Sequence, residues 1–394
     1  MSFPIDTVRA QFPALANNPD LIFFDNPGGT QVPQRVIDAV SHYWATSCAN
    51  IGGAFATSQR TDATVAAARA AMARLLGTSD PYEIVFGASM TALTFHLARS
   101  FGETLKPGDE IIVTNLDHDA NVAPWLDLVK STGAVIRRVP FDPATGLLDR
   151  AALEATLNPG KTRLLAITAA SNALGTTPDV QAATALAHAA GALVYVDAVQ
   201  AVPHIPTDVR ALDCDFLACS AYKFFGPHIG VLYGKREHLE RLTPHKVRPA
   251  KNTIPHCWEQ GTLNHECLAG VAAAVEYIES IGMDAMAHYE AELGAHLLDG
   301  LAQIPNLTVY GPGKHGRVPT VAFTLAGYTP RAVSEILGAA GICSWSGNYY
   351  AVGVMEALDL TDGAVRVGLA HYNTTQEIDR LLDVLRALEC PPQK

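Results

Sequence analysis

The sequence contains no apolar run close to the roughly 20 residues that a membrane-spanning helix needs, and residues 1–18 lack a basic stretch followed by an apolar one. These absences argue against a membrane anchor and a signal peptide, so we expect a cytoplasmic protein. Positive charge is also scarce, because 28 lysines and arginines stand against 39 aspartates and glutamates, for a net charge of -11. Since nucleic acids and anionic membranes bind basic surfaces, we expect neither as a partner.

Cysteine is infrequent too, and its spacing argues against two kinds of site. The seven cysteines include no Cys-x-x-Cys pair, a pattern typical of reduced thiols (Cys48, Cys214, Cys219, Cys257, Cys267, Cys343 and Cys390). His256-Cys257 and His265-x-Cys267 supply four soft ligands, but zinc sites usually pair their ligands more tightly. We therefore expect a packed segment at this place and no bound metal.

Apolar residues, by contrast, are abundant and make up 48% of the 394 residues. Between residues 83 and 233, short apolar runs are separated by helical segments of about 10 to 15 residues. This alternation predicts an α/β fold with a mostly parallel sheet that is covered on both faces. Before it, a strand over residues 21–25 leads into the turn Asn26-Pro-Gly-Gly-Thr30, whose glycines let the backbone approach a ligand closely. An Ala-rich helix is expected over residues 61–76.

The C-terminal part of the chain changes character. Two long helices are predicted over residues 268–281 and 283–304, followed by three strands at 307–310, 320–325 and 364–369. This order is typical of a smaller α+β domain. We predict a large domain over residues 21–283 and a small domain formed by residues 1–20 together with residues 284–394.

Polar residues follow several strands of the predicted sheet, at the point where each strand ends. In chain order they are Ser89 and Thr91, Asp117 and His118, Ser171 and Asn172, Asp197 and Gln200, and Ser220 and Lys223. The carboxyl ends of parallel strands meet at one edge of a sheet, where ligands of α/β proteins bind. We therefore expect these side chains to lie together in one site.

Lys223 lies in a turn between two apolar runs, next to Tyr222 and Phe224. Partial desolvation there would lower the pKa of its amine and allow it to attack a carbonyl, whereas the alternative is a turn lysine that points into water. A cofactor with an aldehyde, a pyridine nitrogen and a phosphate would use the amine of Lys223, the carboxylate of Asp197 and the helix N-terminus at residues 89–91.

Six motifs resemble those of the class V aminotransferase family of pyridoxal-phosphate enzymes, over almost the whole chain. They are Asp117-His-Asp-Ala-Asn-Val-Ala-Pro-Trp125, Ser171-Asn-Ala-Leu-Gly-Thr176, Asp197-Ala-Val-Gln200, Ser220-Ala-Tyr-Lys223, Glu259-Gln-Gly-Thr262 and Arg366-Val-Gly-Leu-Ala-His-Tyr-Asn-Thr374. The branch that looks nearest holds the group II cysteine desulfurases and selenocysteine lyases. The resemblance implies pyridoxal 5'-phosphate (PLP) as cofactor and the PLP-dependent transferase fold (fold type I). In that fold a large, doubly wound, mostly parallel seven-stranded sheet domain is joined to a smaller α+β C-terminal domain.

The resemblance also implies roles for the residues that would hold the cofactor. Lys223 would form a Schiff base with it, Asp197 would pair with the pyridine nitrogen, and His118 would stack on the ring. Gln200 would bond the phenolic oxygen of the cofactor. The phosphate would be held by Ser89, Met90, Thr91, Ser220 and Tyr222.

By the same resemblance, further residues would bind the substrate or contact the cofactor of the second subunit. Arg366 would hold the carboxylate of a small amino acid as a bidentate fork, with Asn172 beside it and touching the cofactor. Gly29 and Tyr349 are expected to be further substrate contacts. Thr262 would reach the phosphate of the other subunit, which implies a homodimer with the active site at the subunit interface. The alternative for Arg366 is a surface ion pair.

The sequence departs from that branch at the position of its nucleophilic cysteine. The branch has Gly-His-His-Cys-Ala where this chain has Gly347-Asn-Tyr-Tyr-Ala351, so Tyr350 occupies the thiol position. Cys343 lies in a nearby predicted strand, where it is a packing residue or, alternatively, a displaced nucleophile. The His-Arg-Gly segment of the branch is likewise replaced by Gly52-Gly-Ala54. We therefore expect no persulfide-forming cysteine.

The expected reaction begins with removal of the α-proton by Lys223 and continues by β-elimination, as in a carbon–sulfur lyase. Transamination and epimerisation stay open as alternatives, with Tyr349 and Tyr350 as general acids or as pocket lining. A non-catalytic protein of the same fold is a more remote alternative. Ser220-x-x-Lys223 also fits acyl-serine hydrolases, but their Ser-Asp-Asn and Lys-Thr-Gly motifs do not occur here.

Overall fold

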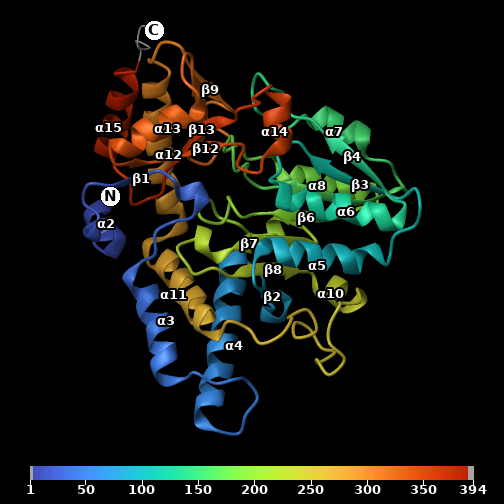
Figure 1. The fold of residues 1–394 in the computed structure, drawn as a ribbon. Coiled ribbons are helices and arrows are strands. Elements are labelled where there is room, and N and C mark those ends of the chain that lie inside the picture. The colour runs from blue at the N-terminus through green and yellow to red at the C-terminus, as the bar shows by residue number, and fades with distance from the viewer. Residues whose placement is uncertain (1–2, 389–394) are drawn as a thin grey trace.

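A seven-stranded sheet lies at the centre of the larger part of the molecule in the computed structural model, which describes residues 3–388 (Figure 1). Its strands run in the order β2-β8-β7-β6-β5-β3-β4. They are β2 (Ile84–Gly87), β3 (Glu110–Thr114), β4 (Val135–Val139), β5 (Thr162–Thr168), β6 (Leu193–Asp197), β7 (Phe216–Ser220) and β8 (Gly230–Gly234). Neighbouring strands pair in parallel except at β8, which is antiparallel to β2 and β7. The predicted α/β class with a mostly parallel sheet is confirmed.

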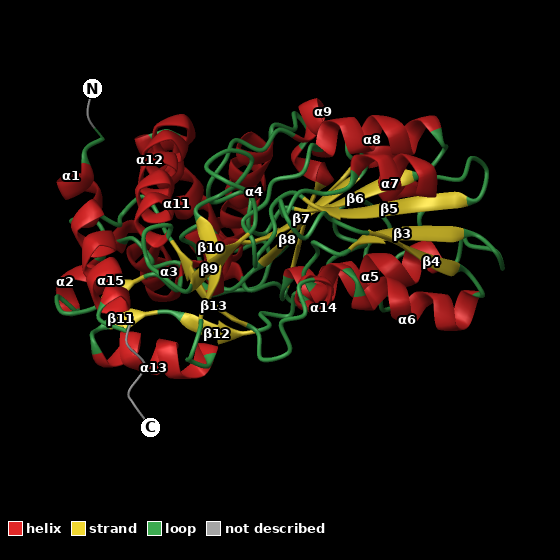
Figure 2. Ribbon diagram, turned by 90° about the horizontal axis from the view of Figure 1, so that it is seen from above, coloured by secondary structure: helices red, strands yellow, loops and turns green. Residues whose placement is uncertain are grey.

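Both faces of this sheet are buried, because its central strands are apolar along their whole length. Leu165 and Ile167 of β5 pack into one core cluster, whereas Leu164 and Ala166 pack into the other. Figure 2 shows α7 and α8 on one face of the sheet and α5 and α6 on the other. The helices of this part are α4 (Ala56–Leu76), α5 (Met90–Gly102), α6 (Ala123–Thr132), α7 (Arg150–Thr156), α8 (Val180–Ala189), α9 (Val209–Leu212), α10 (Arg236–Arg241) and α11 (His265–Ile281).

The C-terminal part of the chain builds a second, antiparallel sheet in the order β12-β13-β10-β9. Its strands are β9 (Leu307–Tyr310), β10 (Thr320–Leu325), β12 (Trp345–Gly347) and β13 (Ala364–Gly368). Apolar side chains of the sheet and its helices, among them Phe323, Val365 and Leu381, form a separate core cluster. The helices of this part are α12 (Met283–Leu301), α13 (Pro330–Ala339), α14 (Val352–Ala357) and α15 (Thr375–Arg386).

The N-terminal segment contacts both parts of the molecule. It consists of helices α1 (Ile5–Arg9) and α2 (Pro13–Asn17), strand β1 (Ile22–Phe23), the 3-10 turn η1 (Asn26–Gly28) and helix α3 (Gln34–Thr46). Strand β1 pairs in parallel with β11 (Ile342–Cys343), and Asp25 forms a bridge with Gly368 at the end of β13. On the other side of the turn, the Thr30 N–H donates to the Tyr222 carbonyl at 3.1 Å. Turn η1 is therefore fixed to both parts of the molecule.

The differences from the predicted elements lie mostly at element ends. The helix expected from residue 61 begins at Ala56, and the strand expected over residues 21–25 is only Ile22–Phe23. Strand β11 confirms the strand expected around Cys343, whereas strand β12 and helix α14 were not predicted, because they are short and β12 has no fully buried residue. The domain boundary proposed after residue 283 falls at the first residue of α12 and stays a prediction.

Within residues 3–388, no helix combines the length and the apolar character needed to cross a membrane. In the same range, no three His, Cys, Asp or Glu side chains gather as metal ligands would. At the segment considered as a metal site, Cys257 is buried and His265 begins α11. Cys390 lies outside the described residues.

Candidate active site

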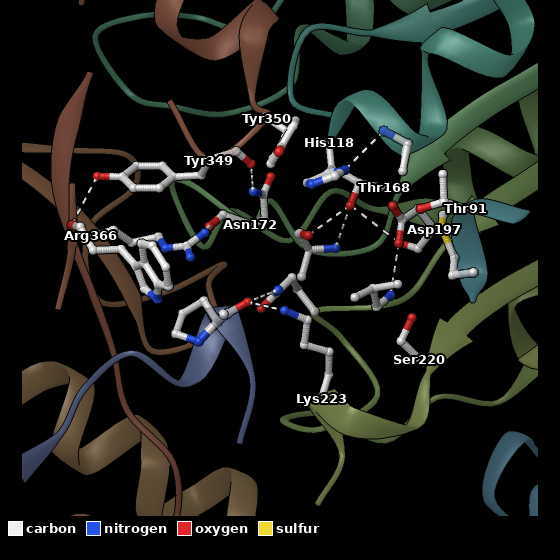
Figure 3. A pocket seen from close by; sticks show the side chains of 18 of the residues that line it. Thr91, His118, Thr168, Asn172, Asp197, Ser220, Lys223, Tyr349, Tyr350 and Arg366 are labelled. Carbon is white, nitrogen blue, oxygen red and sulfur yellow. Dashed lines mark hydrogen bonds between the residues drawn. The ribbon is translucent and has the colours of Figure 1, made fainter. Parts of the chain in front are cut away.

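A cavity of about 500 Å³ opens at the carboxyl ends of strands of the large sheet and faces β12 and β13 (Figure 3). In the view of Figure 3, Thr91 and Asp197 lie at one end, Arg366 at the other, and Lys223 between them. The predicted site residues that line this cavity are Ser89, Met90, Thr91, His118, Asn172, Asp197, Gln200, Ser220, Tyr222, Lys223, Tyr349, Tyr350 and Arg366. The structure thus brings together residues that are up to 277 positions apart, from Ser89 to Arg366 (366 - 89).

Lys223 lies in the 3-10 turn η4 (Ala221–Lys223) that follows β7, and only 7% of the residue is exposed. Its amine donates a hydrogen bond to the Pro27 carbonyl. Burial, reinforced by the positive charge of Arg366, lowers the pKa of the Lys223 amine to about 7, although Asp197 and Asp25 act in the opposite direction. A large fraction of the amine is therefore uncharged and nucleophilic at neutral pH.

We expect the rate at which the cofactor-free, full-length protein captures PLP to rise with pH through a midpoint near 7. Only the uncharged amine attacks an aldehyde, so capture follows the fraction that is deprotonated. The measurement is the growth of visible absorbance after mixing, between about pH 5.5 and 9, with borohydride trapping to identify the labelled lysine. A midpoint near the ordinary lysine value of about 10.4 would contradict a desolvated amine.

Asp197 ends strand β6, and its Oδ1 accepts the Val199 N–H at 2.9 Å. Burial raises the pKa of its carboxyl group to about 6, which leaves it mostly ionised at neutral pH. The neighbouring Asp117 is different, because burial raises its pKa to about 8. At neutral pH Asp197 is therefore the carboxylate of the two that can pair with a protonated ring nitrogen.

His118 caps the 3-10 turn η3 (Asp119–Asn121) that follows β3. Its Nδ1 accepts the Ala120 N–H at 3.0 Å, which places the proton of the neutral ring on Nε2. Burial and the charges of Lys223 and Arg366 lower the pKa of His118 to about 4. The imidazole is therefore a neutral planar group, as a stacking partner for a ring should be. The Tyr350 ring lies 5.5 Å from it on the solvent side, with 69% of Tyr350 exposed.

The first turn of α5 provides a place for a phosphate. Ser89 caps this helix by accepting the Ala92 N–H at 3.1 Å, and the hydroxyl groups of Thr91 and Ser220 line the same part of the cavity. Gly230 makes the arrangement possible, because a Cβ at this position would lie 2.2 Å from the Ser89 carbonyl carbon. Backbone N–H groups at a helix N-terminus, together with hydroxyl donors, favour binding of a phosphate.

Arg366 of β13 is 6% exposed, and its Nη1 donates to the Asn172 carbonyl at 2.9 Å. Its guanidinium carbon lies 4.3 Å from the centre of the Tyr349 ring, and its buried Nε has no hydrogen-bond partner. Within residues 3–388 no carboxylate forms an ion pair with it. Burial lowers the pKa of Arg366 to about 10, so it stays charged at neutral pH. A buried guanidinium with a free donor is suited to hold a carboxylate.

Three residues that were expected to contact the cofactor or the substrate have other contacts or positions in the structure. Gln200 lines the cavity, but its Nε2 donates to the Pro27 carbonyl at 2.9 Å. Gly29 does not line the cavity; it packs beside Tyr222, and its neighbour Gly28 lines the cavity instead. Thr262 is exposed and lines a separate surface depression, away from the cavity of its own chain.

Several cavity residues were missed by sequence reasoning. They are Pro27, Gly28, Ala120, Thr168, Ala170, Val199, Trp345, Ser346, Gly347 and Asn348. The Pro-Gly-Gly turn had been marked as a place of close backbone approach, and this signal could have identified Pro27 and Gly28. No comparable signal marked Trp345, which lies on a half-exposed strand and reaches Gly28 only through tertiary packing.

The donor set fits PLP. A buried amine of low pKa can react with an aldehyde, and a buried carboxylate can pair with a ring nitrogen. A neutral imidazole can stack on the ring face, and a helix N-terminus can bind a phosphate. The unpartnered Arg366 Nε and Asn172 Oδ1 are buried at the opposite end, where an amino-acid substrate would extend beyond the cofactor. Lys223, Asp197, His118 and Thr91 would hold the cofactor in this arrangement.

The sequence comparisons agree with this reading of the cavity. Residues 22–381 match the family described as Aminotransferase class-V. A cysteine desulfurase of Pectobacterium atrosepticum is 36% identical, and the match covers 98% of each chain. A cysteine desulfurase of Synechococcus elongatus is also 36% identical; the match covers 99% of this chain but spans 64% of that protein's length.

Solved structures show the same likeness. The crystal structure of the cysteine desulfurase CsdA from Escherichia coli, with an S-sulfonic acid, has a TM-score of 0.90 at 33% identity and 99% coverage of each chain. The apo cysteine desulfurase from Thermococcus onnurineus NA1 has a TM-score of 0.93 at 29% identity and 98% coverage of each chain. The chain therefore belongs to the class V aminotransferase family of PLP-dependent enzymes.

Proposed function

We propose that this enzyme removes the α-proton of a small amino acid and eliminates the substituent at its β-carbon, as a carbon–sulfur lyase does. The observation that carries the proposal is one cavity that holds both a buried amine of low pKa and a buried guanidinium with a free donor. An amino acid whose carboxylate is bound by Arg366 would place its α-carbon toward Lys223. Bound PLP supplies the electron sink that makes the α-proton removable.

Four residues of the cavity would have separate roles in this reaction. Arg366 binds and orients the carboxylate, and Tyr349 keeps the guanidinium in place by stacking on it. Lys223 accepts the α-proton on its nitrogen, for which a pKa near 7 is well matched at neutral pH. His118 would cover the ring face of bound PLP. Because its imidazole is neutral, it does not lower the proton affinity of Lys223.

The fate of the eliminated group follows from the cysteines. None of the residues that line the described cavity is a cysteine, and Tyr350 occupies the position at which the sequence resemblance places a thiol. Cys343 lies on β11 outside the cavity, and burial with the nearby Asp25 raises the pKa of its thiol. A thiol in that state is a poor acceptor of sulfur. With L-cysteine as substrate, elimination and hydrolysis would therefore give hydrogen sulfide, pyruvate and ammonia.

We further propose that the enzyme works as a homodimer with its active site at the subunit interface. Thr262 is exposed and lines a surface depression separate from the cavity of its own chain, so it is free to approach the phosphate held by a second copy. The exposed aromatic side chains Trp44, on α3, and Phe55, directly before α4, would be removed from water by a second copy.

The proposed reaction is tested by incubating the PLP-loaded protein with L-cysteine and other small amino acids. Sulfide with an equal amount of pyruvate and ammonia is the expected result. Sulfide together with alanine would indicate that the enzyme is a desulfurase and would contradict β-elimination. A conversion of the cofactor to its amine form without sulfide would favour a transaminase, and exchange of the α-proton with change of configuration an epimerase. A protein that binds no PLP would contradict the whole proposal.

Tyr350 is the candidate proton donor to the leaving group, because its ring lies beside His118 at the edge of the cavity. We expect Tyr350→Phe to lower kcat about 10²- to 10⁴-fold while PLP stays bound, since general acid catalysis contributes an effect of this size. Steady-state kinetics and the visible spectrum measure the two effects. Unchanged kcat would reduce Tyr350 to a pocket-lining residue, and the exposed Tyr82→Phe variant serves as the matched control.

A further inference from the structure

The Pro27 carbonyl in turn η1 accepts two hydrogen bonds from the active site. One comes from the amine of Lys223 (dashed line at Lys223 in Figure 3), and the other from Nε2 of Gln200 at 2.9 Å. A carbonyl oxygen has two lone pairs, so both donors are satisfied by one acceptor. The two side chains expected to serve the aldehyde and the phenolic oxygen of the cofactor thus meet on the same backbone atom.

Asn26 fixes the position of this carbonyl from the side of the small sheet. Its Nδ2 lies 2.8 Å from the Gly368 carbonyl, 2.9 Å from the Phe23 carbonyl and 3.1 Å from Oδ1 of Asn373. Its Oδ1 accepts a hydrogen bond from the Tyr372 hydroxyl. Asn26 is buried, so these bonds are shielded from water and restrict the turn strongly.

Gly368 adds a steric restraint. A Cβ built on this residue would lie 2.2 Å from Cγ and 2.4 Å from Cδ of Pro27. The Gly368 N–H donates to the Phe24 carbonyl at 2.7 Å, which locks the two backbones together. Pro27 therefore packs directly against the end of β13, the strand that carries Arg366, and only glycine leaves room for this contact.

We propose that the Pro27 carbonyl is the resting site of the Lys223 amine whenever this amine is not joined to the cofactor, and that Asn26, Gly368 and Tyr372 are the positioning residues that hold it there. The inference rests on the proposed function, which requires the Lys223 amine to be free when it accepts the α-proton. At that moment the lysine must stay within reach of the α-proton.

The hydrogen bond to Pro27 meets this requirement in two ways. A free lysine side chain has several rotatable bonds, and one fixed acceptor limits the positions of its amine. A neutral amine that donates one N–H to a carbonyl also keeps its lone pair available, so it can still accept a proton. Once protonated, it is held more firmly, because hydrogen bonds to charged groups are stronger than neutral ones.

The test compares the pH profile of PLP capture in the cofactor-free, full-length protein and its variants. Gly368→Ala displaces Pro27 and weakens the bond to the ammonium form more than the bond to the amine. We therefore expect the midpoint of the profile to fall by about one pH unit, with slower capture above it. Tyr372→Phe removes only the hydroxyl group that holds Asn26, and a smaller shift in the same direction is expected.

Gly338→Ala is the matched control, because Gly338 lies on α13 of the same part of the molecule and a Cβ there meets nothing within 4 Å. Its midpoint should equal that of the native protein. An unchanged midpoint in folded Gly368→Ala would overturn the inference. If that variant does not fold, an unchanged midpoint in Tyr372→Phe would do so. Failure of the native protein to bind PLP would instead contradict the proposed function.

Discussion

A Lys223→Ala variant is expected to lose the visible absorbance of lysine-linked PLP and to turn over substrate about 10⁴-fold more slowly than the native protein. The same side chain is proposed to form the bond to the cofactor and to accept the α-proton, so one substitution removes both functions. Lys223 is the only lysine among the residues that line the described cavity, and hence no neighbour can replace it.

The loss should not come from unfolding. Burying the Lys223 amine is unfavourable, as its lowered pKa indicates, so alanine at this position should leave the melting temperature unchanged or raise it. Absorbance spectra, borohydride trapping and thermal denaturation measure the three effects. Lys130→Ala is the matched control, because the Lys130 side chain is 74% exposed on α6 and should have none of these consequences. Unchanged absorbance in Lys223→Ala would disprove the assignment.

The sequence was sufficient to place one half of the cavity. Strands β3, β5, β6 and β7 are continuous apolar runs, and their order in an α/β sheet brings the residues that follow them to one edge. His118, Asn172, Asp197 and Lys223 could be grouped for this reason alone. Their chemical roles, by contrast, came from the resemblance to a family and remain proposals.

The other half of the cavity depends on contacts that the sequence pattern does not reveal. Strand β12 is half-exposed and only three residues long, so no apolar run marks it. Tyr349 and Tyr350 adopt positive φ angles of 53° and 58°, which are uncommon for aromatic residues. The Asn172 Nδ2 bond to the Tyr349 carbonyl, at 2.8 Å, helps to hold this conformation. A contact between residues far apart in the sequence thus overrides the preference of these aromatic residues for negative φ angles.

The charges of the cavity explain how its groups act together. Burial and the positive charge of Arg366 lower the pKa of Lys223, whereas Asp197 acts in the opposite direction. Because Arg366 stays charged at neutral pH, the effect falls mainly on Lys223, whose amine becomes a usable base. A substrate carboxylate that neutralises Arg366 would then raise the proton affinity of Lys223 at the moment when it has to accept the α-proton.

We therefore expect Arg366→Met to raise KM and to lower kcat/KM about 10²- to 10³-fold, since loss of one partner from a buried, hydrogen-bonded charge pair has effects of this size. The substitution also removes the positive charge that disfavours the ammonium form of Lys223. The midpoint of PLP capture should consequently move above 7, in the direction opposite to that expected for Gly368→Ala.

Arg366→Lys separates the two effects, because it keeps a positive charge but loses the planar fork and the stacking on Tyr349. We expect it to leave the midpoint of capture close to that of the native protein while KM stays high. Arg331→Ala is the control, since the Arg331 side chain is 79% exposed and pairs with Glu335 on the same helix. Normal KM in both Arg366 variants would mean that the substrate carboxylate binds elsewhere. A raised KM with an unmoved midpoint in Arg366→Met would mean that the guanidinium binds substrate but does not set the basicity of Lys223.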